Sequence, residues 1–195
     1  MINRESYLNR LIHNMWNGEI KVITGIRRCG KSVLLFELFY SYLCEQGVPE
    51  EEIMKIELDQ RRYYKYRNPI TLCEYVESVV QNHKEKKFYL FIDEVQLTTK
   101  VVDKENGGIE VTIYDMLNEL KAYKNLDVYV TGSNSKGLSK DIATEFRGRA
   151  TQIHVFPLSF GEVYSYVGGD ERKALEGYML YGGMPRIFAL EEERD

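Results

Sequence analysis

Residues 25 to 32 read Gly25-Ile26-Arg27-Arg28-Cys29-Gly30-Lys31-Ser32, which matches the pattern G-x-x-x-x-G-K-[ST] in full. A short β-branched segment, Ile20 to Thr24, precedes this stretch, and an apolar helical pattern starts at Ser32. In that setting, the backbone N–H groups of a glycine loop and of a helix N-terminus converge and can surround phosphate oxygens. We therefore predict a phosphate-binding loop between a strand and a helix.

The residues of this loop have distinct expected roles. Lys31 is predicted to reach the β- and γ-phosphates of a nucleotide, and the Ser32 hydroxyl is predicted to bind Mg²⁺. Cys29 has no histidine argued to activate it, so we do not assign it as a nucleophile. The predicted nucleotide contacts are the loop residues and the one that follows them: Gly25, Ile26, Arg27, Arg28, Cys29, Gly30, Lys31, Ser32 and Val33.

Strand and helix patterns alternate along the chain. Short apolar runs predict strands at 20–24, 53–58, 88–92, 128–131 and 151–156. Helical spacing and helix boundaries predict helices at 6–16, 32–44, 69–81, 114–123, 139–146, 160–166 and 172–181. Because apolar strands separated by helices form parallel sheets covered on both faces, we predict an α/β fold with three layers, α/β/α. Residues 98–112 break the alternation, and Asn106-Gly107-Gly108 favours an inserted β-hairpin there, with a loop as the alternative.

Composition limits the class of protein. The 195 residues are 44% hydrophobic and 29% charged, as in globular chains, and the net charge of −4 gives no domain-wide basic field for nucleic acid. Three cysteines without C-x-x-C spacing argue against a disulfide framework or a structural zinc site, and favour a reducing compartment. No apolar run approaches the roughly 20 residues of a membrane helix. We expect a cytoplasmic protein without a membrane partner.

A second group of candidate residues follows two of the predicted strands. Asp93 and Glu94 stand after the strand 88–92, at the sheet edge where ligands of open α/β sheets bind. Asp93 is predicted to hold Mg²⁺ through water, and Glu94 to orient and deprotonate the water that attacks the γ-phosphate. Asn134 follows the strand 128–131 and is predicted to contact the γ-phosphate or that water, unless it only forms a turn.

Several features keep more than one interpretation open. The stretch Arg61 to Arg67 alternates basic residues with tyrosines, as do protein surfaces that bind single-stranded nucleic acid. Such a run can also be a solvated face. No N-K-x-D motif for guanine follows the third strand, which favours adenine as the base. Tyr7, Leu8 and Leu11 fit either an adenine pocket or the core. Gln96 either positions the attacking water, couples the nucleotide state to the inserted hairpin, or is only a polar cap.

These motifs, in this order, resemble the AAA-superfamily ATPases, and more narrowly a group of prokaryotic ATP-binding proteins that carry a further C-terminal domain. The resemblance rests on residues 25–32, 91–96, 131–135, 146–150, 157–160 and 181–185. It implies a sheet of strand order 5-1-4-3-2, with ATP or ADP and Mg²⁺ as cofactors. It also implies that Arg147 or Arg149 is an arginine finger acting between subunits of a homo-oligomer, with a basic surface turn as the alternative.

The resemblance also divides the chain. Residues 1–156 are predicted to form the P-loop ATPase core, which includes an N-terminal helix within 1–17 and the segment 98–112. Residues 157–195 are predicted to form a short helical extension that leads to a missing C-terminal region, unless the chain is a minimal form of the group. The predicted function is Mg²⁺-dependent hydrolysis of ATP, coupled to movement of an attached domain or partner. The alternative is a nucleotide-gated interaction or sensor module with negligible turnover, and the presence of Glu94 favours hydrolysis.

Overall fold

Five parallel strands form the central sheet of the computed structural model, which describes residues 2–104, 107–133 and 150–187. The strands are β1 (Ile20–Thr24), β2 (Ile53–Glu57), β3 (Phe88–Asp93), β6 (Leu126–Gly132) and β7 (Ala150–His154). They lie in the order β2-β3-β6-β1-β7. When the two hairpin strands described below are left out of the numbering, this is the predicted order 5-1-4-3-2 read from the opposite edge.

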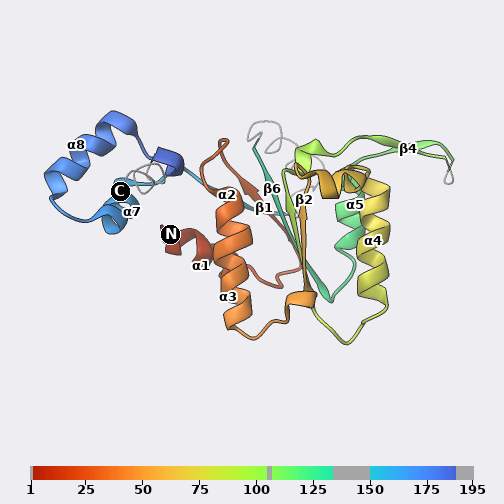
Figure 1. Cartoon of the computed structure of the whole chain (residues 1–195). Coiled ribbons are helices and arrows are strands. Elements are labelled where there is room, and N and C mark those ends of the chain that lie inside the picture. Colours follow the sequence, from red (N-terminus) through yellow and green to blue (C-terminus); the bar gives the residue numbers. More distant parts are fainter. Residues whose placement is uncertain (1, 105–106, 134–149, 188–195) are drawn as a thin grey trace.

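Helices cover both faces of the sheet, which confirms the predicted three layers (Figure 1). One face carries α1 (Glu5–His13) and a continuous helix made of α2 (Lys31–Val33), a π-helical segment η1 (Leu34–Phe39) and α3 (Tyr40–Glu45). The other face carries α4 (Pro69–Gln81) and α5 (Ile113–Leu120). Short 3₁₀ helices are η2 (Glu50–Glu52), η3 (Arg61–Arg67) and η4 (Val95–Leu97). Within the described ranges, no helix is long and apolar enough to cross a membrane.

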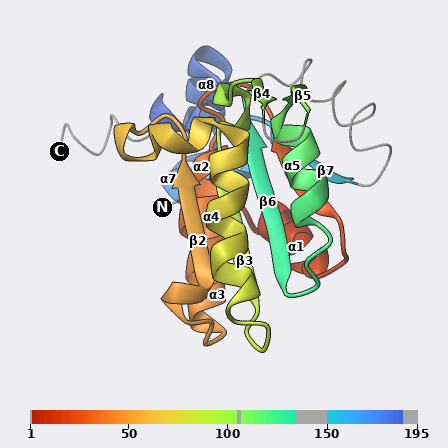
Figure 2. The same ribbon diagram turned by 90° about the vertical axis from the view of Figure 1, so that its right-hand side faces the viewer.

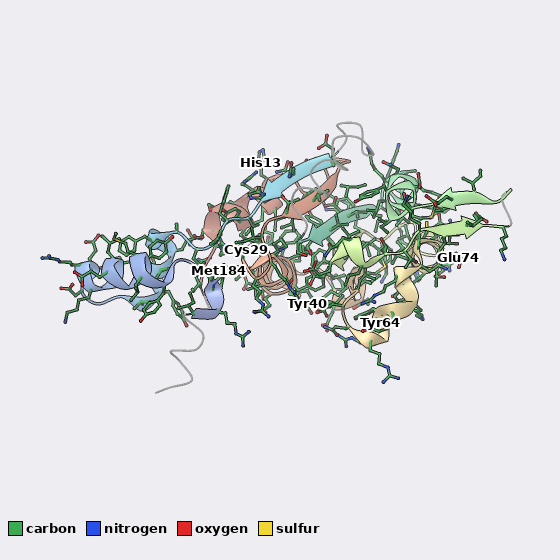
Figure 3. All side chains as sticks on the ribbon, turned by 90° about the horizontal axis from the view of Figure 1, so that it is seen from above. His13, Cys29, Tyr40, Tyr64, Glu74 and Met184 are labelled. Atoms are coloured by element: carbon green, nitrogen blue, oxygen red, sulfur yellow. The ribbon has the colours of Figure 1, made fainter. Side chains whose placement is uncertain are left out.

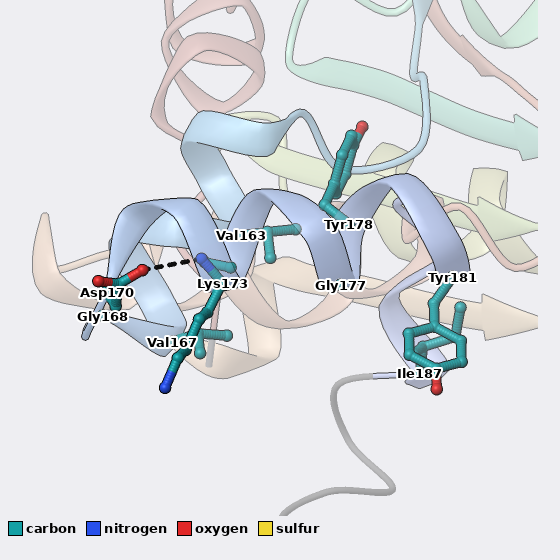
Figure 4. A pocket seen from close by; sticks show the side chains of 10 residues that line it. Val163, Val167, Gly168, Asp170, Lys173, Gly177, Tyr178, Tyr181 and Ile187 are labelled. Carbon is teal, nitrogen blue, oxygen red and sulfur yellow. Dashed lines mark hydrogen bonds between the residues drawn. The ribbon is translucent and has the colours of Figure 1, made fainter.

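Two further helices, α7 (Phe160–Val167) and α8 (Glu171–Tyr181), pack against each other beside the sheet (Figure 1). A small cluster of apolar side chains joins them to the connection after β7, with Leu158 and Val163 buried at its centre. Between the two helices lies a cavity of about 270 Å³, whose lining includes Val163, Tyr178 and Ile187 (Figure 4).

Side-chain caps explain where several helices begin. The Asn68 side chain accepts hydrogen bonds from the backbone N–H groups of Ile70 and Thr71, so α4 starts at Pro69 as predicted. Capping boxes open two other helices, with Thr112 and Asp115 at α5 and Ser159 and Glu162 at α7. The carboxylate of Glu162 also accepts a hydrogen bond from Arg4, which contacts the glycine loop.

The core consists of two layers, one on each face of the sheet. Successive residues of a strand face opposite sides, so Leu90 and Ile92 of β3 pack under α4 and α5, while Tyr89 and Phe91 pack under the helices of the other face. All six residues of β3 are buried. Burial on both faces is the reason that the strands read as unbroken apolar runs rather than as alternating ones.

The predicted hairpin is present. Strands β4 (Val101–Asp103) and β5 (Ile109–Val111) pair in antiparallel fashion and project from the end of the sheet at which its strands finish (Figures 1 and 2). Gly107 and Gly108 adopt φ of 87° and 76°, a left-handed conformation that suits glycine, and the Gly108 N–H donates to the Asp103 carbonyl. The hairpin interpretation is therefore confirmed over a simple loop.

Some predicted boundaries differ from those observed. The first helix ends at His13 rather than Trp16, because Trp16 adopts a positive φ of 58° that is incompatible with helix. The last strand ends at His154 rather than Phe156, because its partner β1 stops at Thr24, where the glycine loop begins. The helix predicted at 139–146 lies outside the described residues.

A buried ion pair joins β1 to β6 at the end of the sheet opposite the glycine loop. Lys21 is fully buried and its ammonium binds the Asp127 carboxylate. Asp127 also accepts hydrogen bonds from the Trp16 backbone N–H (3.0 Å) and the Tyr129 hydroxyl (2.8 Å). Burial lowers the pKa of Lys21 below its ordinary value, and Asp127 opposes that effect. The two charges depend on each other, since neither has water as an alternative partner.

Replacing Asp127 tests this dependence. Asp127→Asn leaves a buried ammonium without its carboxylate and is expected to lower the free energy of unfolding by about 3–5 kcal/mol, measured by urea denaturation. Adding Lys21→Met should recover much of that loss. Glu110→Gln, which removes the exposed partner of Lys100, is the control and should cost less than about 1 kcal/mol. An equally small cost for Asp127→Asn would contradict the assignment.

Candidate functional site

The glycine loop connects β1 to α2 through residues in left-handed conformations. Gly25, Arg28 and Gly30 have φ of 152°, 66° and 98°, so the backbone curls within six residues. A Cβ atom at Gly25 would lie 2.3 Å from the Val155 carbonyl oxygen, which makes glycine necessary there. The strand–loop–helix arrangement predicted from the motif is therefore present, and α2 begins at Lys31.

Lys31 points into the curl of the loop. Its side chain is 4% exposed, and its ammonium donates to the carbonyl oxygens of Gly25 (3.2 Å) and Ile26 (2.9 Å). Arg27 and Arg28, in contrast, are exposed. An ammonium held among carbonyl oxygens at the centre of a loop can exchange them for the oxygens of a bound phosphate.

The structure brings the predicted metal-binding residues together. The Ser32 hydroxyl donates to one carboxylate oxygen of Asp93 (2.8 Å), and the Thr131 hydroxyl donates to the other. Asp93 is buried, which raises the pKa of its carboxyl group, while the two hydrogen bonds oppose that shift. Sequence reasoning does not single out Thr131, although its place at the end of a neighbouring strand is a signal that could have found it.

Glu94 adopts a strained backbone conformation beside Asp93. Its φ and ψ are 53° and 50°, in the left-handed region, and its N–H donates to the Thr131 hydroxyl (3.1 Å). Non-glycine residues held in this region cluster at functional sites. The Gln96 side-chain amide donates both to the Glu94 carboxylate and to the Ser133 hydroxyl. Gln96 is therefore placed to orient the Glu94 carboxylate, a role that the sequence did not indicate.

Other predicted site residues have varied positions. Cys29 is fully buried, its thiol donates to the Val155 carbonyl (3.4 Å), and burial raises its pKa. Ile26, within the loop, and Val33, directly after it, are both exposed. The predicted residues Asn134, Arg147 and Arg149 lie outside the described residues.

Arg4 contacts the outer side of the loop, and sequence reasoning missed it. The guanidinium is 4% exposed and donates to the carbonyls of Cys29 and Phe156 and to the Glu162 carboxylate, each at 2.9 Å. Arg4 thereby joins the loop to the connection after β7 and to α7. Two of its partners are backbone carbonyls and the third is far away in sequence, so no local pattern indicates this role.

The C-terminal part of the described chain also reaches the loop. A Cβ atom placed on Gly30 would lie 3.6 Å from the Arg4 guanidinium and 3.8 Å from the ring of Pro185. The loop is thus enclosed on this side by residues from both ends of the chain.

A cavity of about 700 Å³ lies next to this enclosure, and its lining includes Asn3, Tyr7, Phe156 and Pro157. The Tyr7 hydroxyl accepts a hydrogen bond from the Phe156 backbone N–H (3.2 Å). Leu11 is fully buried in the core instead, and Leu8 packs partly buried against the same core cluster. Of the three residues considered for an adenine pocket, Tyr7 therefore lines a cavity, whereas Leu11 belongs to the core.

The sheet order, the glycine loop and the carboxylates at the adjoining edge define a P-loop NTPase of the AAA superfamily, a class that binds nucleotides. The chain belongs to the AAA domain family, whose model matches residues 17–164.

Comparisons with individual proteins agree with this family. The chain is 32% identical over 197 residues to an uncharacterised protein of Haemophilus influenzae, covering 98% of this chain and 46% of the relative. It is 28% identical over 209 residues to an uncharacterised protein of Methanocaldococcus jannaschii, covering 99% and 40%. The chain thus spans less than half the length of both relatives. A Walker-type ATPase of Pyrococcus abyssi has a similar fold, with a TM-score of 0.56 and 17% identity over 95% of this chain and 65% of that one.

The position of Lys31 yields a prediction about nucleotide binding. Lys31→Met keeps the buried aliphatic stem and removes the ammonium, so the protein should fold while its affinity for Mg²⁺·ATP falls by about tenfold to a hundredfold. This is the range for a hydrogen bond to a charged group. Isothermal titration calorimetry measures it, with Lys84→Met at an exposed position as the control. Equal affinities of Lys31→Met and the wild type would place the phosphates elsewhere.

Proposed function

We propose that this chain hydrolyses ATP to ADP and phosphate in a Mg²⁺-dependent reaction at the edge where the glycine loop meets β3. One observation carries the proposal: a hydrogen bond of 2.8 Å joins Ser32 of the loop helix to Asp93 of β3, and Glu94 is the next residue. The candidate phosphate-binding loop, the candidate Mg²⁺ ligands and the candidate general base therefore lie next to one another.

The loop supplies the binding of phosphates. Backbone N–H groups at a helix N-terminus favour anions, and the loop from Gly25 to Ser32 leads into such an end. Lys31 adds the charge that phosphates need, from a buried position where it is less screened by water. Arg27 and Arg28 are exposed at the rim, so we assign them only backbone contacts with the nucleotide.

The pair formed by Ser32 and Asp93 fits Mg²⁺ by its chemistry. Mg²⁺ prefers oxygen ligands and is commonly bound by one or two protein groups together with phosphates and water. The Ser32 hydroxyl would be such a ligand, and the Asp93 carboxylate, which lies within hydrogen-bond distance of it, would hold the ion through water. When bound, Mg²⁺ would neutralise negative charge on the β- and γ-phosphates. Thr131 holds the Asp93 carboxylate in place.

Glu94 is our candidate for the general base. A carboxylate in this place can accept a proton from the attacking water, and Gln96 orients that carboxylate from the side. Gln96 also donates to the Ser133 hydroxyl, and Asn134 is the next residue in the sequence. We retain Asn134 as a candidate contact of the γ-phosphate or of the water.

The contacts of Arg4 support coupling of the nucleotide to movement. A phosphate that displaces the loop carbonyls from Lys31 alters the loop to which Arg4 is bound, and Arg4 is bound in turn to Glu162 of α7. The same carboxylate caps α7, so loop and helix cannot shift independently. We propose that residues 157–195 act as the extension through which the ATPase core of residues 1–156 moves an attached domain or partner.

Two further assignments complete the proposal. The cavity beside Tyr7 and Phe156 is our candidate for the adenine. Arg147 and Arg149 are retained as candidate arginine fingers acting between subunits of a homo-oligomer.

Glu94→Gln distinguishes hydrolysis from the alternative, a sensor module with negligible turnover. The variant keeps the shape of the side chain and its contact with Gln96 but cannot accept a proton. Phosphate release should fall by about 10²-fold or more, while the affinity for Mg²⁺·ATP stays the same.

Glu110→Gln on the hairpin is the matched control and should leave phosphate release unchanged. Wild-type turnover in Glu94→Gln would mean that Glu94 is not the base. Tight binding without turnover in the wild type would favour the sensor module.

A further inference from the structure

The short helix η3, which follows β2, is unused by the nucleotide site. Its seven residues, Arg61 to Arg67, comprise four cations and three tyrosines, and none is acidic. Although the net charge of the chain is −4, η3 is therefore a local concentration of positive charge. The sequence left open whether this segment is a solvated face or a surface for nucleic acid.

Cations and rings of η3 are stacked on each other. The Arg67 guanidinium lies over the Tyr64 ring at 4.0 Å, and the Arg62 guanidinium lies over the Tyr63 ring at 4.8 Å. A plain solvated face would leave long basic side chains extended into water. These contacts instead hold flat groups in fixed positions and reduce the conformational entropy that a ligand must remove.

One tyrosine anchors the helix and another is available at the surface. Tyr66 is buried and packs against Tyr75 of α4, with ring centroids 4.9 Å apart. Tyr64 is 49% exposed and lies on the outside of the molecule (Figure 3). The Arg67 side chain also donates to the Leu58 carbonyl (2.8 Å), which fixes the cation that covers one face of Tyr64.

The charges around Tyr64 favour an anionic ligand. Arg61, Arg62 and Lys65 are all exposed. The acids of the adjoining segment are Glu57, which pairs with Arg62 at 3.3 Å, and Asp59. Four cations therefore stand against two carboxylates between residues 57 and 67.

We propose that η3 binds single-stranded nucleic acid, with a base stacked on Tyr64 and phosphates bound by Arg61, Arg62 and Lys65. An aromatic ring beside a basic groove is the combination by which proteins bind single strands without reading sequence. A duplex hides the faces of its bases, and an acidic peptide has no flat group for the ring. DNA and RNA share the relevant chemistry.

This surface is physically connected to the site edge. The Thr99 backbone N–H donates to the Arg67 carbonyl (2.8 Å), and Thr99 lies two residues after η4, which contains Gln96. The proposal goes beyond ATP hydrolysis and does not rest on it, because binding can be measured without nucleotide.

The test measures fluorescence anisotropy of labelled dT20 and U20 at low and physiological salt. Wild-type protein should bind at least one of them, more weakly as salt increases. Tyr64→Ala should weaken binding by about fivefold to a hundredfold, the range for loss of one stacked base, and Tyr64→Phe should retain it. Tyr181→Ala removes a tyrosine of α8 that is 60% exposed and should have no effect.

Charge reversals form a second matched pair. Arg61→Glu should weaken binding strongly, while Lys84→Glu, an identical change of charge at the opposite end of the sheet, should have little effect. Circular dichroism verifies that each variant is folded. The proposal is overturned by absence of binding at low salt, by equal effects of Tyr64→Ala and Tyr181→Ala, or by equal binding of duplex DNA or polyglutamate. Comparison of dT20 with U20 distinguishes DNA from RNA.

Discussion

The parallel pairing of β1, β3 and β6 is the constraint on which the rest of the structure depends. In this register Ile92 stands opposite Val130 and Thr24 opposite Gly132, so all three strands finish at one edge. The glycine loop, the carboxylates and the hydroxyl of Thr131 meet there only because no strand is reversed. The buried pair of Lys21 and Asp127 joins two of these strands at their other end. A polar contact therefore joins the central strands at each end: Thr131 with Asp93 at one end, and Lys21 with Asp127 at the other.

Contacts around the loop also connect the site to the C-terminal helices. Arg4 lies between the loop, the segment after β7 and α7. Its three guanidinium nitrogens donate hydrogen bonds to three different segments, at Cys29, Phe156 and Glu162. Burial makes this arrangement costly to break, because a guanidinium without partners cannot be left in the interior. Under the proposed function, these contacts would link nucleotide occupancy to the position of α7.

Local signals allowed much of the fold and part of the site to be predicted. Pro69 at the first turn and the paired glycines at 107 and 108 act over a few residues, so the start of α4 and the hairpin could be inferred. The approach of Ser32 to Asp93 could be expected because the resemblance places only β6 between β1 and β3. The contacts of Arg4 and Thr131 could not, since they depend on backbone carbonyls and on side-chain geometry that only the folded chain creates. The π-helical turns of η1 could not be predicted either, because apolar spacing does not distinguish a π-helix from an α-helix.

The central claim, that the loop binds Mg²⁺·ATP, is tested most directly by the thermal unfolding midpoint. A ligand that binds only the folded state at a hundredfold excess over Kd stabilises it by about 2.7 kcal/mol. For a domain of this size, that corresponds to a rise of about 5–11 °C. The account predicts this rise with Mg²⁺·ATP, a smaller one with Mg²⁺·GTP and almost none with Mg²⁺ alone. An unchanged midpoint at millimolar Mg²⁺·ATP would contradict it.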